Sequence, residues 1–106
     1  MVCRLWRGIA SEENAPRYET VVRNQVIPDI EARAIPGFLH IDLARRSVPQ
    51  GVEFLTIMWF ESLEPVKQFV GENHEAAHVP GDAQAVLLSF DARATHFEVV
   101  DRRPQD

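Results

Sequence analysis

The stretch V-E-F-L-T-I-M-W-F, residues 52–60, decides the fold because it is the most strand-like part of the chain. Seven of its nine residues are apolar, and β-branched and aromatic side chains make up most of it. Such a composition is typical of a strand that is buried on both faces of its sheet. The sequence therefore predicts a sheet that is covered on both sides.

The residues before this stretch predict a second strand, joined to it by a hairpin. Apolar and polar side chains alternate from Phe38, which predicts a strand over residues 38–46. One face of this strand would carry Leu39, Ile41 and Leu43, and the other Phe38, His40 and Asp42. Residues 47–51, S-V-P-Q-G, contain the Pro and Gly that are typical of a turn.

Further towards the N-terminus, the pattern predicts a strand followed by an amphipathic helix. Residues 2–9 favour a strand, and Ser11 followed by acidic residues favours the start of a helix. The helix would end before Ile35-Pro36-Gly37, and Pro28 predicts a kink or a restart near Ile27. Its apolar face, with a spacing of four residues, consists of Tyr18, Val22, Val26 and Ile30.

The residues after the stretch predict helices and a last strand. Ser62 and Pro65 favour a helix start, and Gly71 favours its end. Residues 72–78 suggest a short polar helical turn, and residues 82–90 a third helical run. Residues 95–100 predict a strand, and the charged tail at residues 101–106 is expected to fray.

The order of these elements predicts an α+β fold of the ferredoxin-like, split βαβ type: a four-stranded antiparallel sheet with helices on one face. Residues 1–100 would form this single domain. Helices on one face leave the strand at residues 52–60 uncovered on the other. The simplest way to cover it is a second copy of the chain, which predicts a homodimer.

Composition narrows the functional classes. The chain has 106 residues, a formal charge of −5 and a single cysteine, Cys3, which excludes an intrachain disulfide and a thiolate zinc site. A reducing, cytoplasmic setting is expected, with no membrane span and no signal peptide. Because no basic stripe is present, we expect no nucleic-acid partner.

Three segments carry a resemblance to a known family: W-F-E-S-L at residues 59–63, F-V-G-E-N-H at residues 69–74, and H-F-E-V at residues 96–99. With the order of elements, they resemble the antibiotic biosynthesis monooxygenase family of dimeric α+β barrels. The most telling match is Phe60-Glu61-Ser62 followed by His74. The resemblance implies a homodimer with a ligand pocket between sheet and helices in each copy. Family members include cofactor-independent oxygenases and haem-degrading enzymes.

The haem-degrading branch of that family matches only in part. The histidine that would ligate iron falls on His78, and the family's tryptophan falls on Gln68 or Phe69. The family's asparagine on the first strand has no counterpart in R-L-W-R-G, residues 4–8. Haem degradation is therefore not expected, whereas haem binding through His78 stays open.

His74 and His78 lie four residues apart, so a helix would place them on one face, where they could ligate one metal. The letters H-E-A-A-H also match the zincin motif. A zincin needs a longer amphipathic helix, a third ligand downstream and usually a larger domain, whereas Gly71 and Pro80 limit this segment to about eight residues. A pair of solvated or pocket-lining histidines is the favoured interpretation, and no metal site is expected.

The resemblance and the residue patterns together give the candidate site residues. The catalytic candidates are His74, His78 and Trp59, and the substrate-binding candidates are Arg7, Trp6, Phe69 and His40. Each has a structural alternative. Either tryptophan could pack in the core or the interface, and His40 with Asp42 could make structural contacts. Arg7, on the face opposite Trp6, could pair with Glu53 or Glu98.

The favoured function is a cofactor-independent monooxygenase acting on an apolar, aromatic small molecule. No nicotinamide, flavin or metal motif is present, so electrons would come from the substrate, after a histidine base removes a proton. Two alternatives stay open: a non-catalytic ligand-binding or stress-related homodimer, and an isomerase or lyase that uses the same base.

Overall fold

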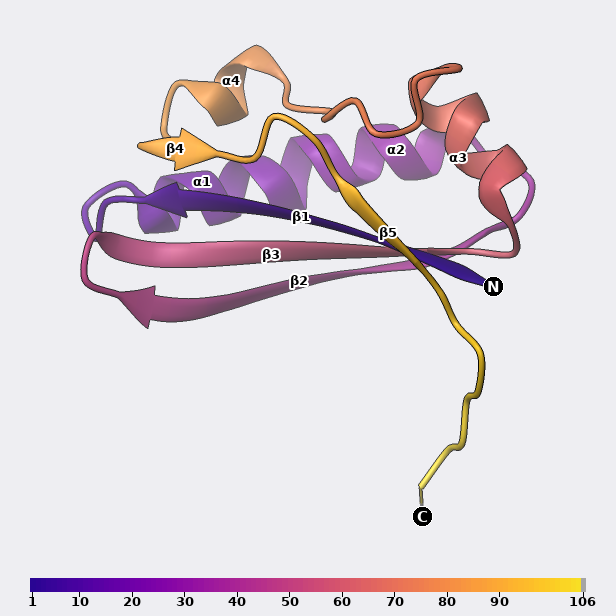
Figure 1. Ribbon diagram of the computed structural model, residues 1–106. Coiled ribbons are helices and arrows are strands. Elements are labelled where there is room, and N and C mark those ends of the chain that lie inside the picture. The colour runs from indigo at the N-terminus through magenta and orange to yellow at the C-terminus, as the bar shows by residue number, and fades with distance from the viewer. Residues whose placement is uncertain (106) are drawn as a thin grey trace.

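The computed structural model describes residues 1–105, and it places all helices on one face of a single sheet (Figure 1). The first helical region is nearly continuous and lies along the sheet. The helical elements in chain order are α1 (Ala15–Val21), a π-helical turn (Val22–Val26), α2 (Ile27–Ala32), α3 (Leu63–Val70) and α4 (Gly81–Gln84). None of them is long and apolar enough to cross a membrane within the described residues.

The apolar stretch forms β3 (Gly51–Phe60) at the centre of the sheet. It pairs antiparallel with β1 (Val2–Ala10) on one side and with β2 (Phe38–Val48) on the other. Two short strands, β4 (Ser89–Phe90) and β5 (Thr95–Glu98), share the outer edge of β1. Because β3 lies between β1 and β2, this is the split βαβ arrangement, and the predicted ferredoxin-like α+β fold is confirmed.

The expected interruption at Pro28 is confirmed and takes the form of a π-helical turn. Proline has no N–H to donate, and its ring crowds the preceding turn. Just before it, the Ile27 N–H donates to the Val22 carbonyl, five residues back, which widens the helix locally. The helix then continues as α2, with Ile30 still facing the core.

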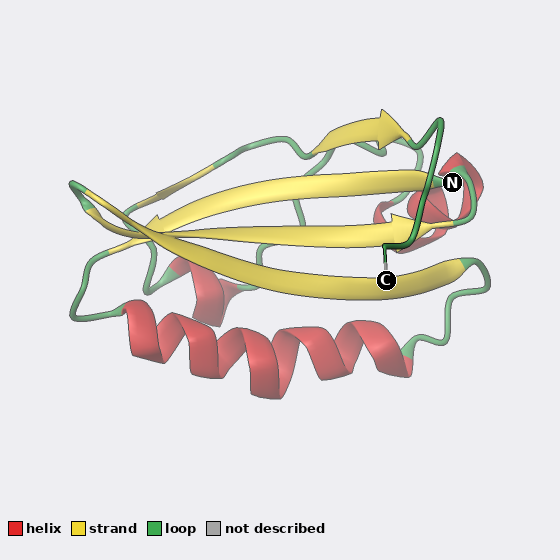
Figure 2. Ribbon diagram, turned by 90° about the horizontal axis from the view of Figure 1, so that it is seen from below, coloured by secondary structure: helices red, strands yellow, loops and turns green. Residues whose placement is uncertain are grey.

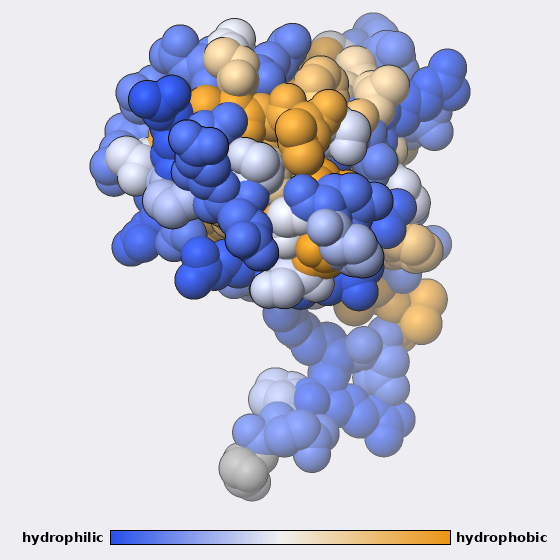
Figure 3. Space-filling model, turned by 90° about the vertical axis from the view of Figure 1, so that its left-hand side faces the viewer, coloured by the Kyte–Doolittle hydropathy of each residue, from blue (hydrophilic) through white to orange (hydrophobic). Residues whose placement is uncertain are grey.

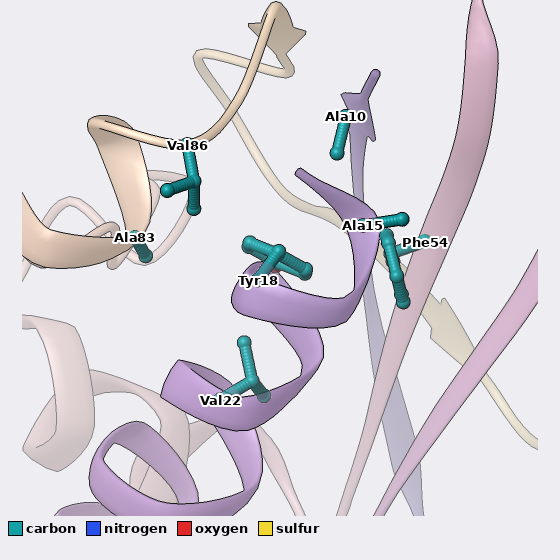
Figure 4. Packing of buried hydrophobic residues seen from close by; sticks show 7 residues of the cluster. All are labelled: Ala10, Ala15, Tyr18, Val22, Phe54, Ala83 and Val86. Atoms are coloured by element: carbon teal, nitrogen blue, oxygen red, sulfur yellow. The ribbon is translucent and has the colours of Figure 1, made fainter. Parts of the chain in front are cut away.

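Two buried clusters join the helices to the sheet. In the first, the rings of Tyr18 and Phe54 lie 4.7 Å apart between α1 and β3 (Figure 4). In the second, Phe60 and Val66 are fully buried between β3 and α3. The glycine at the β2–β3 turn allows this packing: Gly51 has φ +147°, and a side chain there would strike the Ala10 carbonyl.

A β-bulge changes the predicted facing of β2. The register shifts between Phe38 and His40, so that Phe38 joins Ile41 on the helix side. Leu39, expected on the apolar face, is 42% exposed. His40 and Asp42 share a face as expected. The strict alternation was wrong at the start of the strand because one extra residue is absorbed there.

Two predicted helical segments are wrong. Residues 72–78 are not helical: a β-bridge joins Ala76 to Arg93, and side-chain donors take the carbonyls of His74 and Ala76. These interactions use backbone groups that a helix would need. The run predicted over residues 82–90 is helical only in α4, since Ser89 and Phe90 pair with β1 instead.

The other face of the sheet is open, as Figure 2 shows from below, with the helices behind the strands. Leu5, Leu55, Ile57 and Trp59 lie half-buried on it, and Phe97 is 56% exposed. This is therefore the face on which the predicted covering layer would have to pack. Figure 3 shows a separate apolar area at the end of the molecule where β4 lies, and Leu88 and Phe90 are exposed near there.

The C-terminal tail leaves the sheet on the open side (Figure 1). Arg102 lies over the Trp59 ring, 5.1 Å from its centroid. The domain boundary predicted at residue 100 stays a prediction, and the part of it that concerns Asp106 lies outside the described residues.

Replacing Phe60 with alanine should lower the free energy of unfolding by about 3–5 kcal/mol, because a fully buried aromatic side chain leaves a cavity. Urea unfolding followed by circular dichroism measures this change. Leu88→Ala is the control, with a smaller loss expected since that side chain is 61% exposed. An equal loss in both variants would contradict the assignment of the core.

Candidate functional site

A small cavity of about 50 Å³ lies between the sheet and the helices, in the position that the resemblance implied. Most of its lining is apolar. The polar side chains that reach it are Arg4, Trp6, Tyr18, Thr56 and His78. They come from β1, α1, β3 and the segment between α3 and α4, so only the folded chain brings them together.

Arg4 is the most unusual of these residues, since its side chain is charged and the residue is only 3% exposed. It extends from β1 towards the segment between α3 and α4. Its Nη1 donates to the His74 carbonyl and its Nη2 to the Ala76 carbonyl, each at 2.6 Å. Its Nη1 also lies 3.2 Å from Nε2 of His96. Arg4 thereby fastens that segment to the sheet.

The charge of Arg4 has no carboxylate partner. None of the ion pairs within residues 1–105 includes Arg4. Burial lowers the pKa of its guanidinium to about 10, which still leaves it protonated at neutral pH. Neutral groups therefore stabilise a buried cation at the edge of the cavity: two carbonyls, an imidazole nitrogen and the Phe69 ring.

His78 lies beside the cavity and packs edge-on against Phe69, with 5.0 Å between ring centroids. Burial lowers the pKa of His78, and the positive charges of Arg33 and Arg4 lower it further, against the opposing effect of Asp29. His78 is therefore neutral at pH 7. A neutral imidazole can accept a proton from a molecule in the cavity.

Phe69 is in contact with two cations. The guanidinium carbons of Arg4 and Arg33 lie 5.5 Å and 5.4 Å from the centroid of its ring. Arg33 also donates to the Phe69 carbonyl at 3.2 Å. These contacts hold the end of α3 and gather positive charge next to His78.

His74 does not line the cavity and packs against His96, with 5.2 Å between their ring centroids. Burial lowers the pKa of His96 to about 4, helped by Arg4 and His74 and opposed by Glu75. Because residues 72–78 are not helical, the two histidines predicted to share a face are separated. No cluster of three metal-ligating side chains occurs among residues 1–105.

Two aromatic residues complete the polar edge of the cavity. Trp6 lines it and donates its indole N–H to the Asp91 carbonyl at 2.7 Å. Burial raises the pKa of Tyr18 to about 12, so its hydroxyl stays protonated at neutral pH. A planar ligand in an enlarged cavity would therefore meet an indole face and a phenol donor.

The predicted site residues divide between the two faces of the sheet. His78, Trp6 and Phe69 gather at the cavity. The other face holds Trp59, which donates to Asp42 at 3.0 Å and lies 5.3 Å from the His40 ring.

Arg7 also lies on that open face. It pairs with Asp91 at 3.5 Å, and neither of the two glutamates considered from the sequence is its partner. Its expected placement opposite Trp6 is confirmed. Arg7 also lines a shallow hollow of about 510 Å³ on this face, together with Leu5, Leu55 and Phe97.

Sequence reasoning missed Arg4, Tyr18 and Arg33 as site residues. A signal for Arg4 was present: it lies two residues before Trp6 on the same strand, and therefore on the same face. Tyr18 was recognised only as part of the apolar helix face. Nothing in the local pattern marks Arg33, whose role depends on its position beside Phe69.

Comparison with known proteins rests on structure, since no family model matches the sequence and no curated protein matches it. The heme-degrader MhuD from Mycobacterium tuberculosis, solved with two hemes in its active site, aligns with TM-score 0.67 at 19% identity, covering 98% of this chain and 100% of that chain. A monooxygenase from the gene ActVA-Orf6 of Streptomyces coelicolor, in complex with Nanaomycin D, aligns with TM-score 0.64 at 14% identity, covering 99% and 91%.

A dimeric ferredoxin-like protein from an uncultured marine organism aligns with TM-score 0.68 at 11% identity, covering 98% of this chain and 97% of that chain. The chain has the fold of the antibiotic biosynthesis monooxygenases. The resemblance seen in the sequence is thus confirmed for the antibiotic biosynthesis monooxygenase fold.

Within this antibiotic biosynthesis monooxygenase fold, the cavity does not fit a haem. Sites for small molecules of drug size have volumes of about 300–1,000 Å³, whereas this cavity measures about 50 Å³. His78 offers a neutral nitrogen, but its ring packs against Phe69 and the Arg4 guanidinium lies at the edge of the same cavity.

The pKa of His96 predicts a loss of stability in mild acid. The unfolded chain binds a proton at this residue near pH 6.5, whereas the folded chain does so only near pH 4. The free energy of unfolding should therefore fall as the pH is lowered between these two values, and His78 adds to the effect. Urea midpoints measured across this range test the prediction.

In this pH series His96→Gln should flatten the slope, because a glutamine oxygen can still accept from Arg4 and does not titrate in this range. His40→Gln, at an exposed position, is the control and should leave the slope unchanged. A slope that His96→Gln leaves intact would contradict the assignment.

Proposed function

We propose that the chain acts as a homodimer whose copies each bind an apolar, aromatic small molecule between sheet and helices and oxidise it with O₂ without a cofactor. The observation that carries the proposal is the neutral His78 beside a cavity that Trp6, Tyr18 and the Arg4 cation also line. A base, an aromatic surface and a positive charge are what a carbanion-forming oxygenation needs. The monooxygenase of similar fold from Streptomyces coelicolor supports the same reaction class.

The chemistry can be written with the chain's own groups. His78 takes a proton from an acidic methylene of the substrate, and the resulting enolate is stabilised by the Arg4 guanidinium. The enolate gives an electron to O₂, and recombination forms a carbon–oxygen bond. Protonation gives a hydroperoxide. Loss of the second methylene proton then breaks the O–O bond, leaving a carbonyl and one water.

The homodimer forms through the open face of the sheet. The accessible surface of the chain is 6725 Å², whereas a compact monomer of this mass exposes about 6,000 Å². The extended tail accounts for part of the excess. The open face, which carries Leu55 and Phe97, is apolar, and monomers rarely expose large apolar patches. A second copy would cover this face, and a protein of similar fold from an uncultured marine organism is dimeric.

A cytoplasmic setting belongs to the proposal. Cys3 is a free, half-buried thiol on β1, and a reducing compartment keeps such thiols free.

The small volume of the cavity supports a second candidate, a homodimer that binds a ligand without chemistry or in a stress response. About 50 Å³ holds no substrate unless the segment over the cavity moves. An isomerase or lyase would use His78 in the same way, but the proton would return to the substrate before oxygen reacts.

Purified chain under air should consume O₂ when given anthrone, a neutral molecule with an acidic methylene, and should release the matching quinone. His78→Ala should lower the rate by about 10²–10⁴-fold, because the base is lost. An oxygen electrode and absorbance measure the two changes. His40→Ala is the control, since His40 lies on the other face of the sheet.

Oxygen uptake that does not depend on His78 would contradict the assigned base. No uptake above that of anthrone in buffer would contradict oxygenation and favour the binding-only alternative. Proton exchange at the methylene without O₂ uptake would favour an isomerase.

The homodimer should dissociate when a charge is placed in the centre of the open face. Ile57→Glu adds a carboxylate opposite Leu5 of β1, and burying it against a second copy is costly. Light scattering after size exclusion should report a dimer for the unsubstituted chain and a monomer for this variant. Thr20→Glu, on the helix side, should remain a dimer. A monomeric unsubstituted chain would overturn the proposed assembly.

A further inference from the structure

We propose that the molecule bound between sheet and helices is an aromatic carboxylate, whose negative group pairs with the buried guanidinium of Arg4. The inference rests on the proposed function in that it concerns the same cavity, and it names the charge of the ligand. It does not depend on whether the ligand is oxidised.

The first reason is the isolation of the Arg4 charge. Arginine is almost never fully buried unless it is paired, yet Arg4 is 3% exposed and has no carboxylate within ion-pair distance among residues 1–105. Its partners are two carbonyl oxygens and an imidazole nitrogen. A buried cation with only neutral partners gains strongly from an anion placed beside it.

The second reason is the geometry of the guanidinium. A guanidinium carries five N–H donors in a planar fork, and three contacts to acceptors are made here, at His74, Ala76 and His96. Two donors therefore remain for a ligand. The side chain also lines the cavity, so a carboxylate inside it would reach the fork and form paired hydrogen bonds.

The third reason is the sign of the charge around the cavity. The chain as a whole has a formal net charge of −5. The Phe69 ring beside the cavity, however, is in contact with the guanidinium groups of both Arg4 and Arg33. Three histidines face this region, namely His74, His78 and His96, and two acidic residues lie near it, Asp29 and Glu75. Glu75 pairs with Arg93 at 3.7 Å, and Asp29 is exposed on α2. The pocket is therefore locally cationic.

The same contacts explain how a cavity of about 50 Å³ admits a larger molecule. Arg4 holds the segment between α3 and α4 in place through the carbonyls of His74 and Ala76. A carboxylate that pairs with the two remaining donors of Arg4 neutralises the guanidinium and so weakens its bonds to these carbonyls. The segment at residues 71–80 then moves away from β1, and the cavity widens. A neutral ligand leaves the charge of Arg4 in place, so it weakens these bonds less and opens the segment less readily.

A pair of probes that differ in charge and hardly in shape tests the inference: 3-phenylpropanoate and 3-phenylpropanamide. Isothermal titration calorimetry of the unsubstituted chain at neutral pH should give at least about tenfold tighter binding for the carboxylate, since charge-assisted pairing is stronger than pairing with an amide. Arg4→Gln should remove the preference, and Arg4→Lys should keep part of it. Arg7→Gln, on the opposite face, is the matched control and should keep all of it.

Equal affinity for the two probes, a preference that survives Arg4→Gln, or no binding of either probe at millimolar concentration would each overturn the inference. A measurement without substitution guards against misfolded variants. Amide hydrogen exchange at residues 71–80 should quicken when the carboxylate binds and stay unchanged with the amide. Unchanged exchange with the bound carboxylate would overturn the opening of this segment.

The outcomes for the ligand and for the reaction are separable. Oxygen uptake with anthrone together with no carboxylate preference would leave the proposed oxygenation standing and refute this inference. An Arg4-dependent carboxylate preference without oxygen uptake would support this inference and refute the proposed oxygenation.

Discussion

The apolar side chains of strand β3 have to be buried on both faces of the sheet, and the rest of the fold is arranged around this constraint. Its helix-side residues, Phe54 and Phe60, pack against α1 and α3 and are almost completely buried. Its other side carries Leu55 and Ile57, which the single chain leaves half covered. The pairing of β3 with both β1 and β2 protects its backbone. A second layer remains to be supplied on the open face, and a partner copy is the simplest source.

A second constraint is the charge that β1 carries into this apolar interior. Arg4 projects to the helix side between two apolar clusters and is satisfied by carbonyls of the segment that follows α3. Together with the bridge between Ala76 and Arg93, this contact keeps residues 72–78 out of a helix and holds the segment over the cavity. Burial, with Arg33 and then Arg4 adding to it, lowers the pKa of His78 and so suits its neutral imidazole to act as a base.

Much of the fold could be predicted because it follows from local patterns. The β-favouring residues of β1, the apolar run in β3, and the cap, proline and glycine around α3 each specify an element through its own residues. Pro28 marked the change in the first helix correctly. Errors arose where a distant partner decides the local structure. Leu39 is displaced by a bulge, and Ser89 and Phe90 form a strand because β1 offers them an edge.

For the candidate site, the sequence predicted individual residues but not how they group in space. His78, Trp6 and Phe69 were recognised and do meet at one cavity. Trp59, His40 and Arg7 were grouped with them but lie on the other face, where Trp59 contacts Asp42. A sequence cannot give the distance between residues on different strands and loops, so it could not separate the two groups.

The sequence by itself determined the split βαβ order, the excess of apolar residues that calls for a covering layer, and the residue types available for chemistry. These depend on periodicity and composition, which are properties of neighbouring residues along the chain. Only the tertiary structure decided that Arg4 is buried without a carboxylate, that it fastens the segment after α3, and that His78 rather than His74 lines the cavity. Burial and charge pairing depend on residues far apart in sequence, and folding alone brings them within reach of each other.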